Sequence, residues 1–410
     1  MSISDPAPAP ALRRARWAVG ALFLTNGALL ANVLPRYPEI KASLGLANST
    51  YGLAIAAFPA GAILAGLAAG PAIRRLGSGR AAVAGTLLTS LGLLCVAFAP
   101  SAPLLAIALL LAGGFDAITD VAQNAHGLRV QRAYRRSILN GFHAVWSIGA
   151  VLGGTMAAAA IALHLPLAVH LGISAALFAV IALLALRFTL PGADGDAEDG
   201  GAADPAASAA AAPRRLAGRT LAMLLALVTI AMAGALVEDA GNSWATLFLS
   251  RDLGAPAALA AYGFIALVGA QFAGRLIGDR LVDRFGQRAV ARTGGAVIAL
   301  GMGLALAWPT VPGMLLGLAA AGFGSATLVP AAMGEADALP GLKPGTGLTI
   351  VSWLMRLGFL LSPPIVGLVA DAASLRVGLL VVPLAGLAVV VLAGVLKGRE
   401  AEGSPEAGGA

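Results

Sequence analysis

The chain has 410 residues, of which 59% are hydrophobic and 11% are charged, and its mean hydropathy is +0.86. Soluble domains carry about 25% charged residues, so this composition excludes a water-soluble globular protein and indicates a protein surrounded by lipid. The formal net charge is +7, but the arginines stand in short clusters between long apolar runs without interleaved aromatic residues. That arrangement excludes a nucleic-acid-binding domain.

Apolar runs long enough to cross a bilayer, about 20 residues each, follow one another along the chain. The first run is not followed by a small-residue cleavage site, so it predicts a membrane span and not a cleaved signal peptide. None of the runs shows the short alternation of barrel strands, so helices are expected. The predicted spans are 17–35, 50–73, 81–99, 103–128, 137–163, 167–189, 217–249, 256–281, 289–308, 311–335, 345–370 and 375–396.

The sequence therefore predicts an all-α membrane protein with twelve transmembrane helices in two pseudo-symmetric six-helix bundles. Residues 191–215 are rich in Ala, Gly, Asp and Glu and indicate a flexible cytoplasmic linker. The predicted domains are an N-terminal bundle (1–190), this linker, and a C-terminal bundle (216–410). Short sequences repeat between the halves, namely Tyr51-Gly52 with Tyr262-Gly263 and Gly114-Phe115 with Gly322-Phe323. Such duplication is typical of carriers that bind their solute near mid-membrane.

The distribution of positive residues predicts the orientation of the chain in the membrane. Of the 27 Lys and Arg residues, 21 fall on the side that carries both termini, four fall on the opposite side, and Arg275 and Arg356 lie within spans. Because positive residues concentrate on the cytoplasmic side, both termini are expected in the cytoplasm.

Two loops carry a recognisable motif. Asp283, Arg284, Gly286 and Arg288 follow the eighth span, and the related sequence Arg74-Arg75-Leu76-Gly77 follows the second. This pattern resembles the Gly-x-x-x-Asp-Arg-x-Gly-Arg loop of the major facilitator superfamily, although Arg74 stands where the family has its Asp. The resemblance implies a multi-pass secondary carrier.

Further stretches narrow the resemblance. The fourth-span sequence Asp120-Val121-Ala122-Gln123-Asn124 resembles fucose–proton symporter-like carriers. Three other stretches resemble a related group of bacterial inner-membrane carriers: Phe142-His143-Ala144, Glu238-Asp239-Ala240 with Trp244, and 274–280. The resemblance implies a proton–sugar symporter in the bacterial inner membrane, with the first, fourth, seventh and tenth spans around the cavity. We expect a monomer.

The fourth span contains the strongest candidates for proton coupling. Asp116, Asp120, Gln123 and Asn124 are spaced by three and four residues and so share one helical face. Charged side chains inside a span are costly, which makes each one a functional hypothesis. A carboxylate in a semi-dry cavity can load and release a proton. We expect Asp120 to be the proton carrier, Asp116 to be the next candidate and Asn124 to bind solute; the alternative is a structural ion pair with a cation such as Arg356.

The seventh span contributes a second polar face. Glu238 and Asn242 are four residues apart, and in the resembled fold Glu238 would face the fourth-span acids. Asn26 and Asn32 on the first span are expected to join this group. Trp244 could stack on a sugar-like solute or anchor the helix at the interface, and Asp239 is interpreted as a cap or hydrated residue near the outer end.

Candidate gating residues follow on the eighth span and its loop. Gln271, Arg275 and Asp279 recur in steps of four. We expect Arg275 to pair with Asp279 near the cytoplasmic end, linked to the Asp283-Arg284 loop, and the alternative is direct contact with solute.

Two further ionisable residues could take part. Arg356 lies within the eleventh span and needs a partner, which Asp116, Asp120, Glu238 or a solute carboxylate could supply. His143 in the fifth span could assist a proton relay or serve as a packing residue.

No metal-ligand spacing or nucleotide-binding loop is present, so neither cofactor nor metal is expected. The main hypothesis is proton-coupled symport of a small polar solute. Proton-driven export of drugs or metabolites is the alternative, because Gly149 to Gly154 match an antiporter motif except that Ala150 replaces Pro. An enzyme is not expected, because His143 with Asp120 has no catalytic motif around it.

Overall fold

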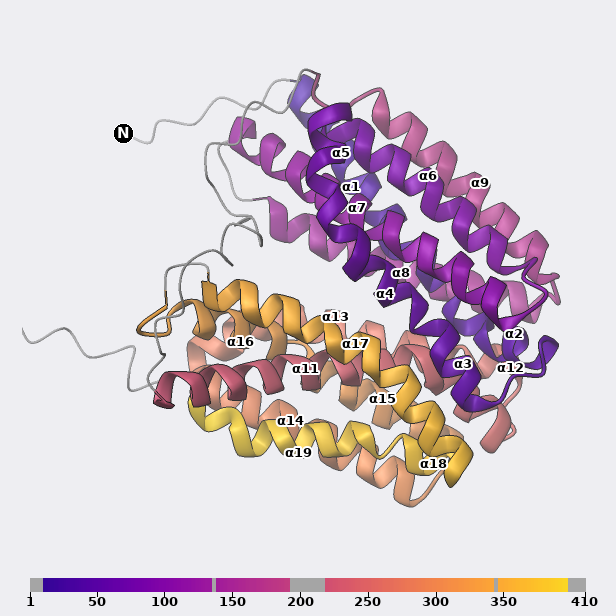
Figure 1. The fold of residues 1–410 in the computed structure, drawn as a ribbon, viewed down its shortest axis with the longest axis vertical. Coiled ribbons are helices and arrows are strands. Elements are labelled where there is room, and N and C mark those ends of the chain that lie inside the picture. The colour runs from indigo at the N-terminus through magenta and orange to yellow at the C-terminus, as the bar shows by residue number, and fades with distance from the viewer. Residues whose placement is uncertain (1–9, 135–137, 192–217, 343–345, 397–410) are drawn as a thin grey trace, which may run out of the picture. The chain divides into compact units, whose positions relative to one another are not determined.

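The structure is a computed structural model that describes residues 10–134, 138–191, 218–342 and 346–396 (Figure 1). Within these ranges, 12 helical segments are long and apolar enough to cross a membrane. Each overlaps one predicted span, so the predicted all-helical, twelve-span architecture is confirmed. The segments are Pro10–Ser43, Asn48–Leu76, Ser78–Val96, Ala102–Tyr134, Gly141–Ala162, Leu167–Leu186, Gly218–Asp252, Ala257–Phe285, Gln287–Ala307, Val311–Asp337, Thr346–Ala372 and Leu375–Val395.

The chain forms two compact units. The first contains residues 1–46 and 57–197, and the second contains residues 47–56 and 198–410. The short segment 47–56 thus packs with the second unit, although the predicted boundaries place it in the N-terminal bundle. Apart from Pro191, the predicted linker 191–215 lies outside the described residues.

In the first unit, α7 packs beside α6 and α4, while α1 packs beside α8 and α9. Figure 1 shows α6 and α9 running side by side. A core of Ala15, Val19, Phe23, Val130 and Phe142 joins three of these helices. The elements are α1 (Pro10–Ala31), η1 (Leu34–Arg36), α2 (Tyr37–Ser43), α4 (Ala57–Ala65), η2 (Gly66–Ala68), α5 (Ala69–Leu76), α6 (Ser78–Val96), α7 (Ala102–Tyr134), α8 (Leu139–Ala162) and α9 (Leu167–Leu186).

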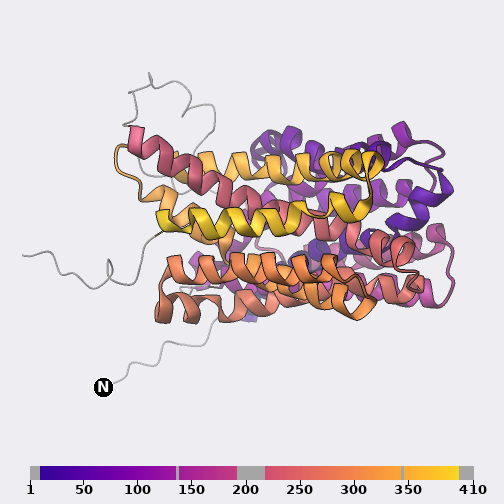
Figure 2. The same ribbon diagram turned by 90° about the horizontal axis from the view of Figure 1, so that it is seen from below.

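In the second unit, α11 packs along α17, and α14 lies between α15 and α19. Figure 2 shows α19, in yellow, running beside the orange helices that include α14. The elements are α3 (Asn48–Ile55), α11 (Gly218–Leu247), a π-helical turn η3 (Phe248–Asp252), α12 (Ala257–Ala260), α13 (Tyr262–Phe285), α14 (Gln287–Ala307), α15 (Val311–Ser325), α16 (Leu328–Asp337), α17 (Thr346–Ala372), α18 (Leu375–Gly378), α19 (Val381–Leu392) and η4 (Ala393–Val395).

The two loops that carry the family-like motif have the same backbone geometry. Gly77 joins α5 to α6 and Gly286 joins α13 to α14, and both have φ of 81°. Their ψ values are 150° and 153°. This region of backbone space is essentially restricted to glycine. The internal repeat therefore extends from sequence to backbone conformation.

Candidate functional site

Asn26 on α1 is the centre of a polar cluster in the first unit. Its Nδ2 donates to Asp116 Oδ1 on α7 at 2.7 Å. Its Oδ1 accepts from Trp146 Nε1 on α8 at 2.9 Å and from Gln123 Nε2 at 3.3 Å. Asn26 is 7% exposed and Gln123 is fully buried. The Asn26 amide therefore links α1, α7 and α8, and every group in these contacts apart from the Asp116 carboxylate is neutral. Asn26 thus lies beside a fourth-span acid, as expected.

Asp120 lies one helical turn along the same face in a different environment. Its side chain is exposed, whereas Asp116 is partly buried. Asn124 Nδ2 donates to Asp120 Oδ1 at 3.1 Å, and Gln123 Nε2 lies 3.3 Å from the same oxygen. The two acids are thus connected through amides, and Asp120 is the more exposed of the two.

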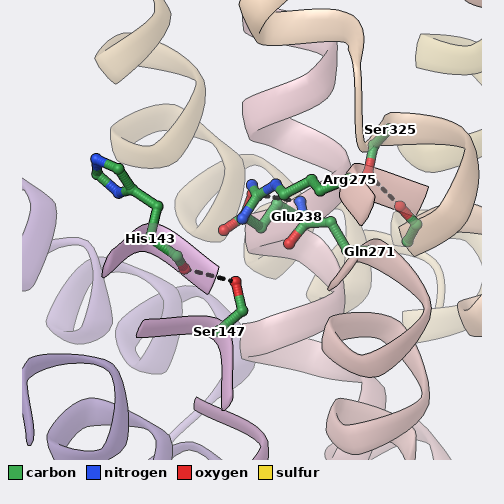
Figure 3. Close-up of polar contacts among 7 residues, drawn as sticks. His143, Ser147, Glu238, Gln271, Arg275 and Ser325 are labelled. Atoms are coloured by element: carbon green, nitrogen blue, oxygen red, sulfur yellow. Dashed lines mark hydrogen bonds and ion pairs between the residues drawn. The ribbon is translucent and has the colours of Figure 1, made fainter. Parts of the chain in front are cut away.

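His143 on α8 is exposed, and its ring meets the Phe23 ring edge-on at a centroid distance of 5.3 Å. The Ser147 hydroxyl donates to the backbone carbonyl of His143 at 3.2 Å, while the imidazole points away from that contact (Figure 3). The geometry leaves open both interpretations of His143, the relay and the packing residue.

Other polar residues of the first unit have structural partners. Asn32 and His170 are both buried, and Nε2 of His170 lies 2.9 Å from Oδ1 of Asn32. His126 is also fully buried and contacts the Ser78 hydroxyl at 2.8 Å. These contacts link helices within the unit and do not belong to the Asn26 cluster.

Glu238 on α11 is the centre of a cluster in the second unit. Gln271 Nε2 on α13 donates to Glu238 Oε2 at 2.7 Å, and Arg275 lies 3.7 Å from the same oxygen (Figure 3). The expected pairing of Arg275 with Asp279 is wrong: in the described residues, the ion pair of Arg275 is with Glu238. The reason is that α13 packs against α11, so the guanidinium reaches across to the neighbouring helix. Asp279 is exposed.

The loop after α13 is also exposed. Asp283 and Arg284 are both at the surface, and the Arg284 guanidinium lies over the Phe285 ring at 5.3 Å. Their proposed gating role stays a prediction.

Trp244 is completely buried and packs edge-on against the Tyr51 ring of α3 at 4.9 Å. The expectation that the indole anchors the helix at the lipid interface is therefore wrong, because α3 covers it, and its stacking on a solute stays a prediction. Asn242, on the same helix, is partly buried, and its Oδ1 has no hydrogen-bond partner among the described residues.

Arg356 on α17 is partly exposed. Within the described residues of the second unit it forms no ion pair with Glu238, whose oxygen is occupied by Gln271 and Arg275. The alternatives, Asp116, Asp120 or a solute carboxylate, stay predictions.

Sequence reasoning missed a buried set in which Asp239 on α11 lies close to the hydroxyls of Ser243 and Ser362. Asp239 is 9% exposed, Ser243 is 7% and Ser362 is 0%. Asp239 was interpreted as a hydrated or capping residue, and its burial contradicts a hydrated position. The i, i+4 spacing of Asp239 and Ser243 is visible in the sequence, but the contribution of Ser362 from α17 is not.

Comparisons with known proteins agree with this architecture. The model of the Major Facilitator Superfamily matches residues 18–281 and 243–410. An uncharacterized transporter of Sinorhizobium fredii, y4wD, is 30% identical over 385 residues, which cover 92% of this chain and 97% of that protein.

Solved transporter structures share the fold. A variant of the nucleoside transporter NupG superposes with a TM-score of 0.75 at 13% identity, covering 93% of this chain and 98% of that one. For a D-xylose–proton symporter the TM-score is 0.69 at 17% identity, with 93% and 95% covered. For FucP in the outward conformation the values are 0.59 and 18%, with 94% and 99% covered.

Proposed function

This chain belongs to the Major Facilitator Superfamily, and on that premise we propose that it couples proton entry to the uptake of a small polar, sugar-like solute. It is a multi-pass membrane protein and a secondary transporter, not an enzyme. The solute and the coupling ion belong to the proposal.

The position of Asp116 carries the proposal. A charged carboxylate in a span is costly, and the side chains that hold Asp116 and its partner Asn26 are neutral amide and indole donors, which do not cancel the charge. Asp120 lies one turn away, and two like charges at this spacing disfavour each other. A shared proton relieves both costs. In this proposal Asp120, the exposed acid, exchanges the proton with water, and Asp116 is its partly buried partner.

Polar side chains near these acids supply candidate solute contacts. Amides such as Asn124 and Gln123 present both donors and acceptors, which suit sugar hydroxyls. In the second unit, the side-chain oxygen Oδ1 of Asn242 has no hydrogen-bond partner among the described residues, and the Arg356 guanidinium forms no ion pair with Glu238. Both groups could contact a solute. We assign His143 to the same set of contacts.

We assign gating to the charged residues of α13 and its loop, Arg275, Asp279, Asp283 and Arg284. Arg275 is 41% exposed and lies 3.7 Å from Glu238, so the pair is weak enough to open and close. We assign Glu238 to proton coupling as well, because its carboxylate can take up a proton when the Arg275 guanidinium moves away from it.

The proposed location is the bacterial inner membrane, with both termini in the cytoplasm. The excess of Lys and Arg on one side supports this orientation, and the bacterial relative supports the location. The proposed state is a monomer.

Uptake into proteoliposomes tests the proposal. A panel of monosaccharides, beginning with D-xylose, is offered with an imposed pH gradient, because a gradient of one pH unit supports about tenfold accumulation per proton. Asp120→Asn and Asp116→Asn should abolish accumulation, while Asp252→Asn, a change at the exposed last residue of η3, should not. Uptake that ignores the gradient, or that survives in both variants, refutes proton coupling.

Proton-driven export of drugs or metabolites is the second candidate. Its sequence support, the glycines at 149 and 153, has a packing explanation, because a Cβ at either position would collide with the backbone carbonyl of Leu24 or Ala28 on α1. Altered drug sensitivity of a deletion strain, without an uptake defect, would favour export.

A further inference from the structure

Asp239 and Glu238 are adjacent on α11 but belong to different clusters. Successive residues of an α-helix point about 100° apart. Glu238 contacts Gln271 and Arg275 on α13. Asp239 instead contacts the Ser243 hydroxyl, which lies 3.4 Å from its Oδ1, and lies close to the Ser362 hydroxyl of α17. The second carboxylate is therefore separate from the gating pair.

The Asp239 cluster is buried and incompletely hydrogen-bonded. Asp239 is 9% exposed and Ser362 is 0% exposed. Asp239 Oδ2 and Ser362 Oγ are both buried, and neither makes a hydrogen bond of normal geometry to a described residue. A buried charge without a partner is strongly unfavourable, so this carboxyl requires either a proton or a bound cation.

The charges around Asp239 do not supply that cation. No Lys, Arg or His among the described residues forms an ion pair with it. Glu238, its neighbour on α11, adds negative charge, and Arg275 on α13 is engaged with Glu238. Tyr51 on α3 faces the cluster with a neutral hydroxyl.

All of the available ligands are oxygen atoms: two carboxylate oxygens and two hydroxyls. Hard cations prefer oxygen ligands, and a single carboxylate balances a single positive charge. The donor set therefore suits a proton or Na⁺ and does not suit a transition metal.

The helix α3 covers this cluster. Figure 1 shows α3 beside α17. The Tyr51 hydroxyl donates to the backbone carbonyl of Ser243 at 2.8 Å, and Tyr51 is itself fully buried. Gly52 lies so close to the Pro363 carbonyl, next to Ser362, that a Cβ there would collide with it. The helix α3 therefore contacts the backbone of Ser243 and of Pro363, the residue after Ser362.

Asp371 near the end of α17 holds the start of α3. Its carboxylate oxygens accept from the backbone N–H groups of Asn48, at 2.9 Å, and Ser49, at 2.7 Å. The N-cap position, Ala47, has no side chain that could cap the helix, so Asp371 supplies the cap from a different helix. Both ends of α3 are joined through the chain to residues of the first unit, at 46–47 and 56–57.

We propose that Asp239, Ser243 and Ser362 form a binding site for a monovalent hard cation, a proton or Na⁺, and that α3, held by Asp371, controls access to it. This site belongs to the second unit and shares no residue with the Asp116–Asp120 pair of the first unit, so it does not depend on the proposed function. If occupied during transport, it adds a second coupling cation to the cycle.

Cation binding is tested on the full-length protein in nanodiscs. The probes are Na⁺ and H⁺ themselves: thermal denaturation in NaCl against choline chloride at equal ionic strength, and infrared difference spectra of the carboxyl C=O band as pH is varied. Saturable stabilisation by Na⁺ that is lost in Asp239→Asn and Ser362→Ala identifies Na⁺. A titrating carboxyl band that is absent in Asp239→Asn, without a Na⁺ effect, identifies the proton.

The control is Asp252→Asn, which should behave as the unmodified protein in both measurements. If Asp239→Asn does not fold, Ser362→Ala alone still tests the Na⁺ effect, and the infrared titration is read from Ser362→Ala as a displaced band. The cation site is refuted if Na⁺ has no effect and no carboxyl band depends on Asp239 or Ser362.

The cover is tested by thiol labelling in a Cys95→Ser background, because Cys95 is the free, exposed cysteine. Ser362→Cys should react slowly with a membrane-impermeant thiol reagent. Adding Asp371→Asn should speed the reaction about tenfold, because it weakens two charge-assisted hydrogen bonds. Equal rates with and without Asp371→Asn refute control by α3, whatever the outcome of the cation experiments.

Discussion

The two units hold their membrane carboxylates in contrasting ways. In the first, Asp116 is held by the neutral amide of Asn26, and no cation among the described residues pairs with it. In the second, Glu238 accepts from Gln271 and faces the Arg275 guanidinium. A carboxylate held by neutral donors can gain a proton without breaking an ion pair. A carboxylate that faces a cation loses its electrostatic attraction to that cation when it is protonated. The contrast supports the proposed assignment of proton exchange to the first unit and of gating to the second.

The largest effect is expected from Asn26→Ala. This change removes one charge-assisted and two neutral hydrogen bonds and takes away a partner from polar groups on α7 and α8, so the free energy of unfolding should fall by about 3 kcal/mol. Denaturation in detergent, followed by circular dichroism, measures the change. Thr229→Ala, at an exposed hydroxyl that bonds its own helix, is the control and should stay within about 0.5 kcal/mol. If Asn26→Ala lowered the stability no more than Thr229→Ala does, the hydrogen bonds of Asn26 would not be what stabilises the cluster.

The next effect is expected from Gln271→Leu, in the cluster of the second unit. It removes the one short hydrogen bond that the described residues donate to the Glu238 carboxylate, at 2.7 Å, and should cost about 2 kcal/mol because the acceptor is charged. A double-mutant cycle with Glu238→Gln measures the coupling of the pair. An interaction free energy near zero would show that Gln271 does not hold Glu238.

Gly77→Ala and Gly286→Ala compare the two units at equivalent loops. Both glycines have φ of 81°, a conformation in which a side chain costs about 1–3 kcal/mol. Each substitution should therefore lower the stability by a similar amount in the same denaturation assay. Gly20→Ala on α1 is the matched control, because nothing lies within 4 Å of its added Cβ and its helical backbone favours alanine. If Gly77→Ala and Gly286→Ala lowered the stability by clearly different amounts, the two loops would share their sequence motif but not its structural role.

The architecture could be predicted because lipid imposes it locally. Each span must supply its own apolar length and satisfy its own backbone, so twelve runs in the sequence become twelve helices. The glycine loops were likewise recognisable from a short motif. Helix ends were less predictable: the fourth span continues to Tyr134, because an amphipathic end can extend a helix beyond the apolar core.

The partners of individual side chains were not predictable to the same degree. Asn26 and Asp116 are 90 positions apart, and only helix packing brings them together. Spacing suggested that Arg275 would pair with Asp279, yet a neighbouring helix offered Glu238. The burial of Trp244 could not be predicted, because Tyr51 of segment 47–56 packs against it and no periodicity in the sequence assigns that segment to the second unit.

The smallest effect is expected from Arg275→Met, which sharpens the contrast between the units. The guanidinium is 41% exposed and lies 3.7 Å from Glu238, and ion pairs of this kind contribute about 0.2–1 kcal/mol. Stability should therefore fall by less than 1 kcal/mol, well below the loss in Gln271→Leu. Methionine keeps the apolar stem of the side chain, so the change reports on charge. High salt should diminish the difference between Arg275→Met and the unmodified protein, because screening weakens an exposed pair. A salt-independent loss as large as that of Gln271→Leu would mean that Arg275 holds Glu238 structurally, and α13 would then have no weak contact to open.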